Sequence, residues 1–256
     1  MAAPMNRFKQ SLMAGDTLFG CWMSIGEGYT AHILGRAGFD WLLIDGEHSP
    51  NDIRSIRDQV LALESSNSEV VVRVPVGETW IIKQILDLGV QTILVPIVET
   101  AEQAKDLVRA CRYPPEGTRG VGYSVSRAGG FGAYDNYGPT AGDQICLLVQ
   151  VETKLGLENL DEIIAVEGVD GVFIGPADLS ASLNYLGQAM HPDMQATILA
   201  ALKQISDSGK AAGILTTDDG MIQSSLNSGA RFVAVAMDIA MLLGNAKKSA
   251  AKWKAT

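Results

Sequence analysis

The chain has 256 residues, 47% of them hydrophobic, and a formal net charge of −9 at pH 7. This charge argues against nucleic acid and anionic membrane surfaces as partners, because both would repel the protein. Small anionic substrates are not excluded, since one arginine or metal ion can dominate inside a cleft. We expect residues 1–256 to form a single domain, because this length suits one α/β barrel with a sizeable core.

The three cysteines, Cys21, Cys111 and Cys146, are odd in number and lack metal-ligand spacing. This pattern indicates reduced thiols in a reducing compartment. Residues 1–16 are too polar for a signal peptide, and no apolar run reaches the roughly 18 uncharged residues that a membrane helix needs. We therefore expect a soluble, cytoplasmic protein.

Eight short runs rich in Val, Ile and Leu predict strands, and their near-continuous apolarity is typical of strands buried on both faces of a parallel sheet. They are residues 17–24, 39–45, 69–75, 91–98, 145–152, 169–176, 211–216 and 231–238. Apolar residues at helical spacing lie between most of them, at 27–38, 51–64, 79–89, 100–112, 156–168, 191–209 and 219–229, and a terminal helix covers 238–254.

This alternation predicts a (β/α)₈ TIM barrel. A doubly wound open sheet is the alternative, but no GxGxxG follows the first strand. Residues 113–142 form the one long irregular stretch. A loop of that length in a compact domain is usually functional or disordered, and its aromatic residues and two arginines favour a functional role.

In such a barrel the active site lies at the carboxyl ends of the strands. The second predicted strand runs into Asp45, Glu47 and His48, and the third ends at Arg73. The other polar or turn-forming residues at strand ends are Gln150 and Glu152, Gly175 to Asp178, Thr216, and Asp238. We expect these side chains to converge on one mouth.

Glu152 and Asp178 are the candidate metal ligands. Two carboxylates from adjacent strand ends can hold a hard divalent cation such as Mg²⁺ and leave positions open for water and substrate oxygens. Asp178 could instead cap the helix that follows it, and Glu152 could pair with Lys154. No Cys or His pair has the spacing of a structural zinc site.

The turn Gly175-Pro176-Ala177 precedes a helix, and backbone N–H groups at a helix start attract anions such as a substrate carboxylate. Pro176 has no N–H, so Ala177 and Asp178 would have to donate. A connecting turn without a ligand is the alternative reading of this segment.

Arg73 at a buried strand end needs an anionic partner. Asp45 or Glu47 could serve structurally, and a developing enolate oxygen could serve functionally. His48 is the only one of three histidines at a strand end, and an imidazole there suits proton transfer near neutral pH. We expect structural roles for His32 and His191.

A Schiff-base aldolase needs a desolvated lysine, typically within a strand, and none of the eight strand runs contains one. Lys154 follows the fifth strand, beside acids that would keep it charged. For carbon–carbon bond chemistry, metal-assisted enolate stabilisation is therefore the better mechanism.

Longer segments resemble a known family. FDWLLIDGEHSPN, VVVRVP, LDLGVQTILVPIV, RYPPEGTRGVG, LVQVET and EGVDGVFIGPADLS, with HPDMQ and GARFVAVAMD beyond them, resemble the class II pyruvate aldolases of the 4-hydroxy-2-oxoheptanedioate aldolase family. The resemblance runs nearly end to end and in order. It implies a (β/α)₈ barrel whose last helix is exchanged between subunits, a homohexamer assembled from dimers, and a bound Mg²⁺, Mn²⁺ or Co²⁺.

The resemblance also implies the reversible cleavage of 4-hydroxy-2-oxo acids to pyruvate and an aldehyde. His48 would be the general base, with Asp87 raising its basicity, and Arg73 would stabilise the enolate oxygen. Glu152 and Asp178 would bind the metal. The pyruvate portion would contact Gln150 and Ala177, within the turn formed by Gly175, Pro176 and Asp178, and Asp45 and Glu47 would orient water and metal.

Asp87 lies near the end of the third main predicted helix, away from the strand ends, so a contact with a histidine would cross a subunit interface. A solvated helix residue is the alternative. The 113–142 stretch keeps the small and aromatic residues expected around the distal end of the substrate. It does not determine which aldehyde is the partner of pyruvate.

Three other functions are compatible with these residues. Oxaloacetate decarboxylation needs the same enolate stabilisation but no aldehyde pocket. Citryl- or malyl-CoA lyases share the metal logic, although nothing in the sequence suggests a CoA site and the chain is short for them. A non-catalytic barrel that binds a small anion is the alternative from another class.

Overall fold

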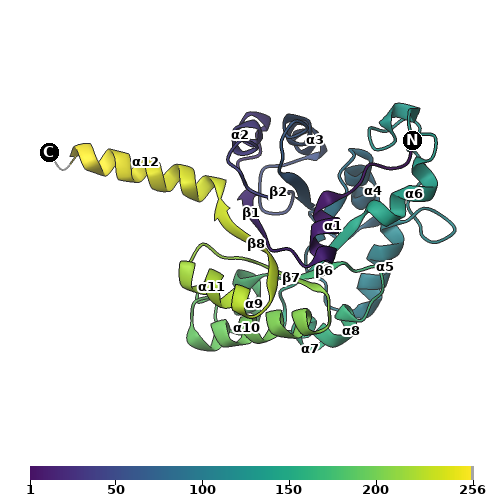
Figure 1. The fold of residues 1–256 in the computed structure, drawn as a ribbon. Helices are drawn as coiled ribbons and strands as arrows, with labels where there is room; N and C mark the ends of the chain where they lie inside the picture. Colours follow the sequence, from purple (N-terminus) through teal and green to yellow (C-terminus); the bar gives the residue numbers. More distant parts are fainter. Residues whose placement is uncertain (255–256) are drawn as a thin grey trace.

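A computed structural model describes residues 1–254. Eight parallel strands form a closed barrel in chain order, and the last pairs with the first. They are β1 (Leu18–Met23), β2 (Trp41–Asp45), β3 (Glu69–Arg73), β4 (Thr92–Val95), β5 (Cys146–Val151), β6 (Gly171–Ile174), β7 (Ala211–Leu215) and β8 (Ala230–Met237). The predicted (β/α)₈ barrel is confirmed, and its helices surround the strands in Figure 1.

The helices follow the predicted spacing closely. They are α1 (Arg7–Ala14), α2 (Gly28–Leu34), α3 (Ile53–Ala62), α4 (Thr79–Asp87), α5 (Ala101–Cys111), α6 (Tyr137–Gln144), α7 (Lys154–Glu158), α8 (Leu160–Ile164), α9 (Pro176–Ser182), α10 (Pro192–Asp207), α11 (Asp219–Asn227) and α12 (Asp238–Lys254). Capping boxes define two starts: Asp52 with Ser55 at α3, and Thr100 with Gln103 at α5. In each, side chains satisfy backbone N–H groups that have no partner within the helix.

Three details differ from the sequence expectation. The short amphipathic helix α1 precedes the barrel, and the single helix expected at 156–168 is divided into α7 and α8 by a break at Asn159. The 113–142 stretch is not wholly irregular, because it contains the 3₁₀ turn Gly130–Gly132 and the start of α6. In that stretch Tyr123 packs against both Tyr113 and Tyr137, with ring centroids 5.6 Å apart in each pair.

Alternate residues of each strand enter two separate cores, as the two-residue period of a strand requires. Ile44, Val72, Val149 and Ile174 face the surrounding helices, whereas their neighbours along the strands fill the barrel interior. The interior residues include Trp22, Leu43, Val71, Leu148 and Phe173. This parity determines which polar residues beyond the strands point into the mouth.

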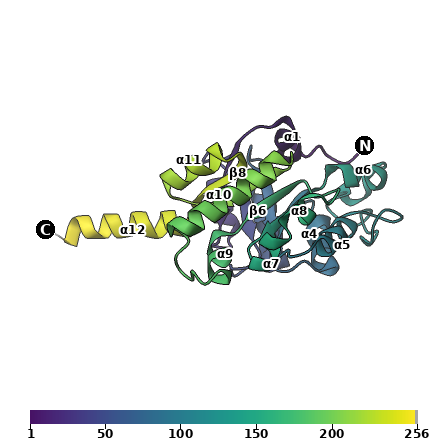
Figure 2. The same ribbon diagram turned by 90° about the horizontal axis from the view of Figure 1, so that it is seen from below.

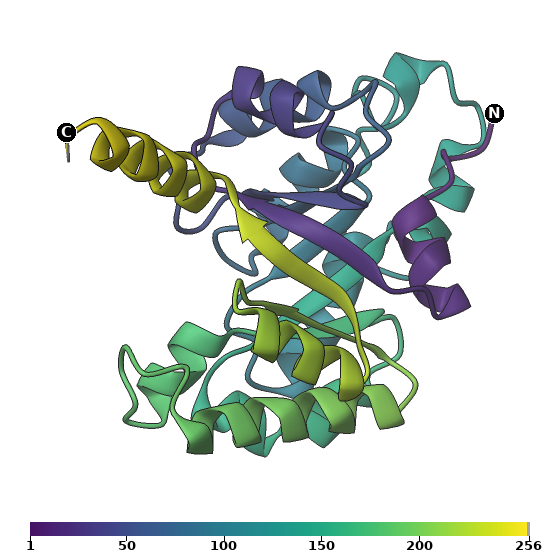
Figure 3. The same cartoon turned by 60° about the vertical axis from the view of Figure 1, so that its left-hand side comes forward.

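Aromatic rings close the amino-terminal end of the barrel. Phe8 of α1 lies edge-on to Trp41 and Phe232, at 6.0 and 6.1 Å between centroids. Phe173 continues the stack, 5.9 Å from Phe232 and 5.7 Å from Trp22. Figure 3 shows α1 beside the end of the barrel opposite to the one that β8 leaves toward α12.

Helix α12 does not fold back over its own barrel but projects away from it in two perpendicular views (Figures 1 and 2). Its first residue, Asp238, is buried and accepts the N–H groups of Ser24 at 2.9 Å and Ile25 at 3.1 Å. Farther along, Ile239, Leu242 and Leu243 are exposed. None of the helices in residues 1–254 has the length and apolarity to cross a membrane.

Candidate active site

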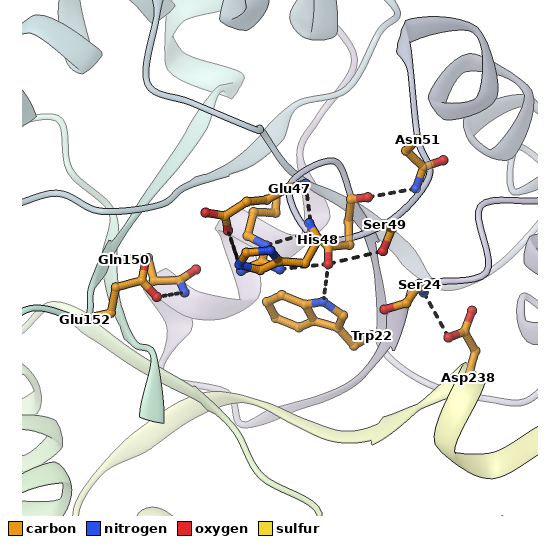
Figure 4. Close-up of polar contacts among 11 residues, drawn as sticks. Trp22, Ser24, Glu47, His48, Ser49, Asn51, Gln150, Glu152 and Asp238 are labelled. Atoms are coloured by element: carbon orange, nitrogen blue, oxygen red, sulfur yellow. Dashed lines mark hydrogen bonds and ion pairs between the residues drawn. The ribbon is translucent and has the colours of Figure 1, made fainter. Parts of the chain in front are cut away.

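The carboxyl ends of the strands carry the polar residues expected there. Asp45 and Arg73 end β2 and β3, and they follow Leu43 and Val71 on the interior face. Gln150 and Glu152 follow Leu148 in the same way on β5. Strand parity therefore directs these four side chains toward the same end of the barrel, and Figure 4 shows Gln150 and Glu152 there.

Arg73 is held by two carboxylates. Its Nε and Nη2 donate to Oδ1 and Oδ2 of Asp45 at 2.8 and 2.7 Å. Its Nη1 lies 2.7 Å from Oε2 of Glu47, an ion pair without hydrogen-bond alignment. Both acids thus fill the structural role considered for them, and the planar guanidinium is fixed in one orientation.

Asp45 organises the segment that follows it. Burial alone would raise the pKa of Asp45, but hydrogen bonds from Arg73, the charge of Arg73 and further N–H donors outweigh burial, so the pKa lies below its ordinary value. These donors are the backbone N–H of Glu47 at 3.0 Å and the Trp22 indole at 3.2 Å. A buried Asp45 therefore stays ionised beside Arg73.

Glu152 is almost completely buried at the end of β5. Its Oε1 accepts the backbone N–H of Ile97 at 2.9 Å, and its Oε2 accepts the side-chain amide of Gln150. Gly175 leaves room for it, since a Cβ at that position would lie 2.3 Å from Oε2. The alternative pairing with Lys154 is wrong, because Lys154 lies instead near Glu158.

Asp178 lies in the first turn of α9 and lines the cavity at the mouth. The alternative role as helix cap is also wrong, because Gly175 occupies the N-cap position and no side chain caps this helix. In residues 1–254, no Lys, Arg or His lies within ion-pair distance of Glu152 or Asp178. Asp178 therefore lines the cavity and Glu152 contacts the lining residue Gln150, and neither carboxylate has a cationic side chain beside it among the described residues.

The charge balance at Glu152 and Asp178 fits a divalent cation. Burial raises the pKa of Glu152 to about 7. The negative charges of Asp178 and Glu47 add to this rise, and the N–H groups of Ile97 and Gln150 partly offset it. A cation would relieve this repulsion. Within the described part of the chain no three His, Cys, Asp or Glu side chains form a metal cluster, so other oxygens would complete the shell, as is usual for Mg²⁺.

A cavity of about 390 Å³ opens between these strand ends. Its polar lining consists of Ser24, Asp45, His48, Arg73, Gln150 and Asp178, together with the turn Gly175, Pro176 and Ala177. The apolar lining consists of Trp22, Phe173, Leu215, Met237 and Ile239. This size suits a small organic molecule, and Oε1 of the buried Gln150 has no hydrogen-bond partner within residues 1–254.

His48 lies at the rim of this cavity. Its side chain is 65% exposed, and Nε2 lies 3.8 Å from Oε2 of Glu47. The other two histidines are structural, as expected. The His32 ring contacts the carbonyl of Ala62 and the Arg36 guanidinium, and His191 caps the start of α10.

Glu47, Glu152, Thr216 and Asp238 are expected at the mouth but do not line this cavity. Glu47 and Glu152 instead contact residues that do, Arg73 and Gln150.

Asp87 lies away from the strand ends altogether. It ends α4, is absent from the cavity wall, and pairs through Oδ1 with Arg119 at 2.8 Å. Arg119 is fully buried and lies over the Tyr113 ring at 4.6 Å. The 113–142 stretch likewise contributes no residue to this cavity. Within one chain, neither feature contacts the mouth residues.

Several functional positions carry no polar signal in the sequence. Trp22 donates to Asp45 and stacks on Arg73, 4.8 Å from ring centroid to guanidinium carbon. Ile97 acts through its backbone N–H, and it adopts a left-handed conformation with φ 54°. The parity of β1 could have identified Trp22, whereas no sequence pattern indicated the conformation of Ile97.

The closed barrel and the acidic, arginine-containing mouth at its carboxyl end are typical of a TIM-barrel enzyme. Residues 18–244 match the model of the HpcH/HpaI aldolase/citrate lyase family. The chain belongs to that family. The predicted aldolase superfamily is thus confirmed at this level.

Individual relatives cover almost the whole chain. It is 78% identical to a hydroxypyruvate/pyruvate aldolase of Roseobacter denitrificans, over 99% of both chains. It is 53% identical to a 2-keto-3-deoxy-L-rhamnonate aldolase of Salmonella schwarzengrund, over 91% of this chain and 87% of that one. A crystal structure of a family protein from Burkholderia cenocepacia superposes with a TM-score of 0.93 at 38% identity, covering 98% and 100% of the two chains. These names do not single out the 4-hydroxy-2-oxoheptanedioate aldolase.

Proposed function

We propose that this protein is a divalent-metal-dependent aldolase that reversibly cleaves 4-hydroxy-2-oxo acids to an aldehyde and pyruvate or hydroxypyruvate. The observation that carries the proposal is that Asp178 lines one cavity together with the doubly anchored Arg73. The buried Glu152 lies near enough to Asp178 for the two negative charges to repel each other. The relative at 78% identity bears the name hydroxypyruvate/pyruvate aldolase. That name supports these two 2-oxo acids as the nucleophilic half of the substrate and specifies no aldehyde.

Glu152 and Asp178 would hold Mg²⁺, Mn²⁺ or Co²⁺, which supplies Lewis-acid stabilisation of negative charge on the 2-oxo acid. Arg73 would donate an N–H to the C2 oxygen as the C3–C4 bond breaks and charge moves onto it. Gln150 and the backbone N–H of Ala177 would orient the pyruvate portion. These roles rest on the resemblance and on the shared cavity.

His48 would accept the C4 hydroxyl proton in the cleavage direction and return it in synthesis. No lysine lies in the eight strands of residues 1–254, which favours this route over Schiff-base formation. Asp87 would act on a histidine only from another copy of the chain, because Arg119 holds it away from its own mouth.

We further propose that the protein is a homo-oligomer, a hexamer built from dimers, in which α12 packs on a neighbouring barrel. The exposed Ile239, Leu242 and Leu243 support this arrangement, because an apolar helix face without cover in its own chain is stabilised by a partner. The same assembly would bring the Asp87 region of one copy toward the mouth of another.

The test is release of pyruvate or hydroxypyruvate by chelator-treated protein, before and after addition of Mg²⁺, Mn²⁺ or Co²⁺. The substrates are 4-hydroxy-2-oxoheptanedioate and the adducts of pyruvate and hydroxypyruvate with small aldehydes. Activity that depends on metal supports the proposal, and equal activity without metal refutes the roles of Glu152 and Asp178. Turnover of oxaloacetate alone would indicate a decarboxylase, and 2-oxo acid binding without any turnover would indicate a binding protein.

A further inference from the structure

The segment after β2 folds back on Arg73 through contacts made by Asp45, Gly46 and Glu47. The backbone N–H of Gly46 donates to the Arg73 carbonyl at 2.8 Å. A Cβ at position 46 would lie 2.6 Å from that carbonyl oxygen, so only glycine permits this approach. The Asp45 carboxylate accepts the Glu47 N–H, which turns the chain and directs the Glu47 side chain toward the guanidinium.

Oxygen Oε2 of Glu47 lies between two functional groups. Arg73 Nη1 is 2.7 Å from it, and His48 Nε2 is 3.8 Å from it. Both of these residues line the cavity, whereas Glu47 does not. Its side chain is only 13% exposed, so it contacts the residues that face the substrate rather than the substrate itself.

The surrounding charges are consistent with this bridging position. Burial raises the pKa of Glu47, the charges of Arg73 and His48 oppose that effect, and those of Asp45 and Asp178 add to it. Asp45 is already committed to Arg73 through both of its oxygens. Within the described residues, Glu47 is therefore the carboxylate left to contact the imidazole.

We infer that Glu47 is a positioning residue that holds the Arg73 guanidinium and the His48 imidazole at a fixed separation through one shared oxygen. This inference rests on the proposed function for the roles of Arg73 and His48, but not for the contact itself. It gives His48 a carboxylate partner within its own chain, Glu47, whereas the resemblance implies an effect of Asp87 from another copy. The carboxylate fixes where the proton acceptor lies relative to the group that stabilises charge.

The first measurement is independent of turnover. The chain has three histidines, so their ring signals can be followed by ¹H–¹⁵N NMR in metal-free protein, with His48→Gln assigning the His48 signal. Glu47→Ala is expected to shift and broaden the His48 signals while those of His32 and His191 stay unchanged. Glu162→Ala, an exposed acid on α8, is the matched control and is expected to change none of the three.

The second measurement separates positioning from substrate binding. Glu47→Ala is expected to lower kcat at least tenfold with KM changed less than threefold. Glu47→Gln keeps an oxygen that can accept from Arg73 and is expected to recover most of kcat.

Unchanged His48 signals in Glu47→Ala, or a kcat equal to that of Glu162→Ala, would overturn the inference while leaving an aldolase function intact. If the wild type cleaves no hydroxy-oxo acid, the proposed function fails, and the NMR comparison still decides the contact. If Glu47→Ala loses its fold by circular dichroism, Glu47→Gln is used for the NMR comparison. Its His48 signals are expected to move, since the neutral amide loses the ionic contact, and unmoved signals overturn the inference.

Discussion

Arg73 and Asp45 form a two-pronged ion pair at the end of neighbouring strands, with N–O distances of 2.8 and 2.7 Å and both side chains buried. The two residues are also partners in the register of β2 and β3. Backbone pairing thus fixes the separation of the Cα atoms, and the side chains complete the contact. The guanidinium is therefore held in one orientation at the mouth.

Breaking this pair is expected to destabilise the protein strongly. Asp45→Asn leaves a buried guanidinium with Glu47 as its only ionic partner, and removing one member of a buried pair typically costs about 3–5 kcal/mol. Asp58→Asn removes an equal charge from the exposed pair with Arg57 and is expected to cost less than about 1 kcal/mol. Urea unfolding at neutral pH measures both, and equal effects would contradict a structural role for the pair.

The same pair predicts a pH dependence. Because the folded-state pKa of Asp45 lies below its ordinary value of 3.8, the folded state binds this proton less readily than the unfolded state. The resulting stabilisation is fully present above the ordinary value and is lost as pH falls through the folded pKa. The difference in unfolding free energy between wild type and Asp45→Asn should therefore shrink on acidification below about pH 4. A constant difference down to pH 2 would be inconsistent with the depressed pKa.

Gly175→Ala should disable the site without unfolding the barrel. The new Cβ would lie 2.3 Å from the Glu152 carboxylate, so that side chain must move. We expect at least a tenfold loss of Mn²⁺ affinity by calorimetry, the scale seen when groups that orient a ligand are changed. Gly244→Ala on α12, where a Cβ meets nothing within 4 Å, is the control, and a Gly175→Ala variant with wild-type affinity would refute the packing argument.

Glu152→Gln should abolish the rise in thermal stability that metal binding produces. The wild-type Tm is expected to rise when Mn²⁺ is added, because a ligand that binds only the folded state stabilises it by mass action. The variant has a side chain of nearly the same size but without the charge, and its Tm should not respond to Mn²⁺. A response equal to that of the wild type would show that Glu152 is not a ligand.

Charges on the exposed face of α12 should dissociate the proposed oligomer. Leu242→Asp with Leu243→Asp places two carboxylates where an apolar contact is proposed. We expect light scattering to report a smaller assembly, with activity reduced if Asp87 acts between copies. Lys247→Asp with Lys248→Asp, farther along the same helix, tests whether charge alone has this effect.

The polar part of the site could be predicted from sequence because acids and an arginine at the end of apolar strands stand out against their surroundings. Asp45, Arg73, Gln150 and Glu152 all have the parity that points inward, and the structure confirms their placement at the strand ends. Periodicity also predicted the barrel, since strands buried on both faces differ clearly from helices in apolar spacing.

Other features depend on contacts that no local pattern encodes. Leu215 and Met237 line the cavity, but as apolar strand residues they are indistinguishable in sequence from the core. The pair Arg119–Asp87 joins residues 32 apart along the chain, and the hydrophobic spacing of α12 does not say which barrel its apolar residues contact. Tertiary geometry decides these points.

The aromatic floor formed by Phe8, Trp41, Phe232 and Phe173 restricts how substrate selectivity can vary. Close-packed rings cannot move aside for a longer molecule. Any additional length of substrate must therefore extend out of the barrel at its carboxyl-terminal end. For the proposed aldolase reaction, a new aldehyde preference would therefore arise from substitutions in the loops around the rim, while the depth at which the 2-oxo acid binds would stay the same. The depth of substrate binding and the length of substrate that fits are thus determined by separate parts of the chain. One can change during evolution without disturbing the other.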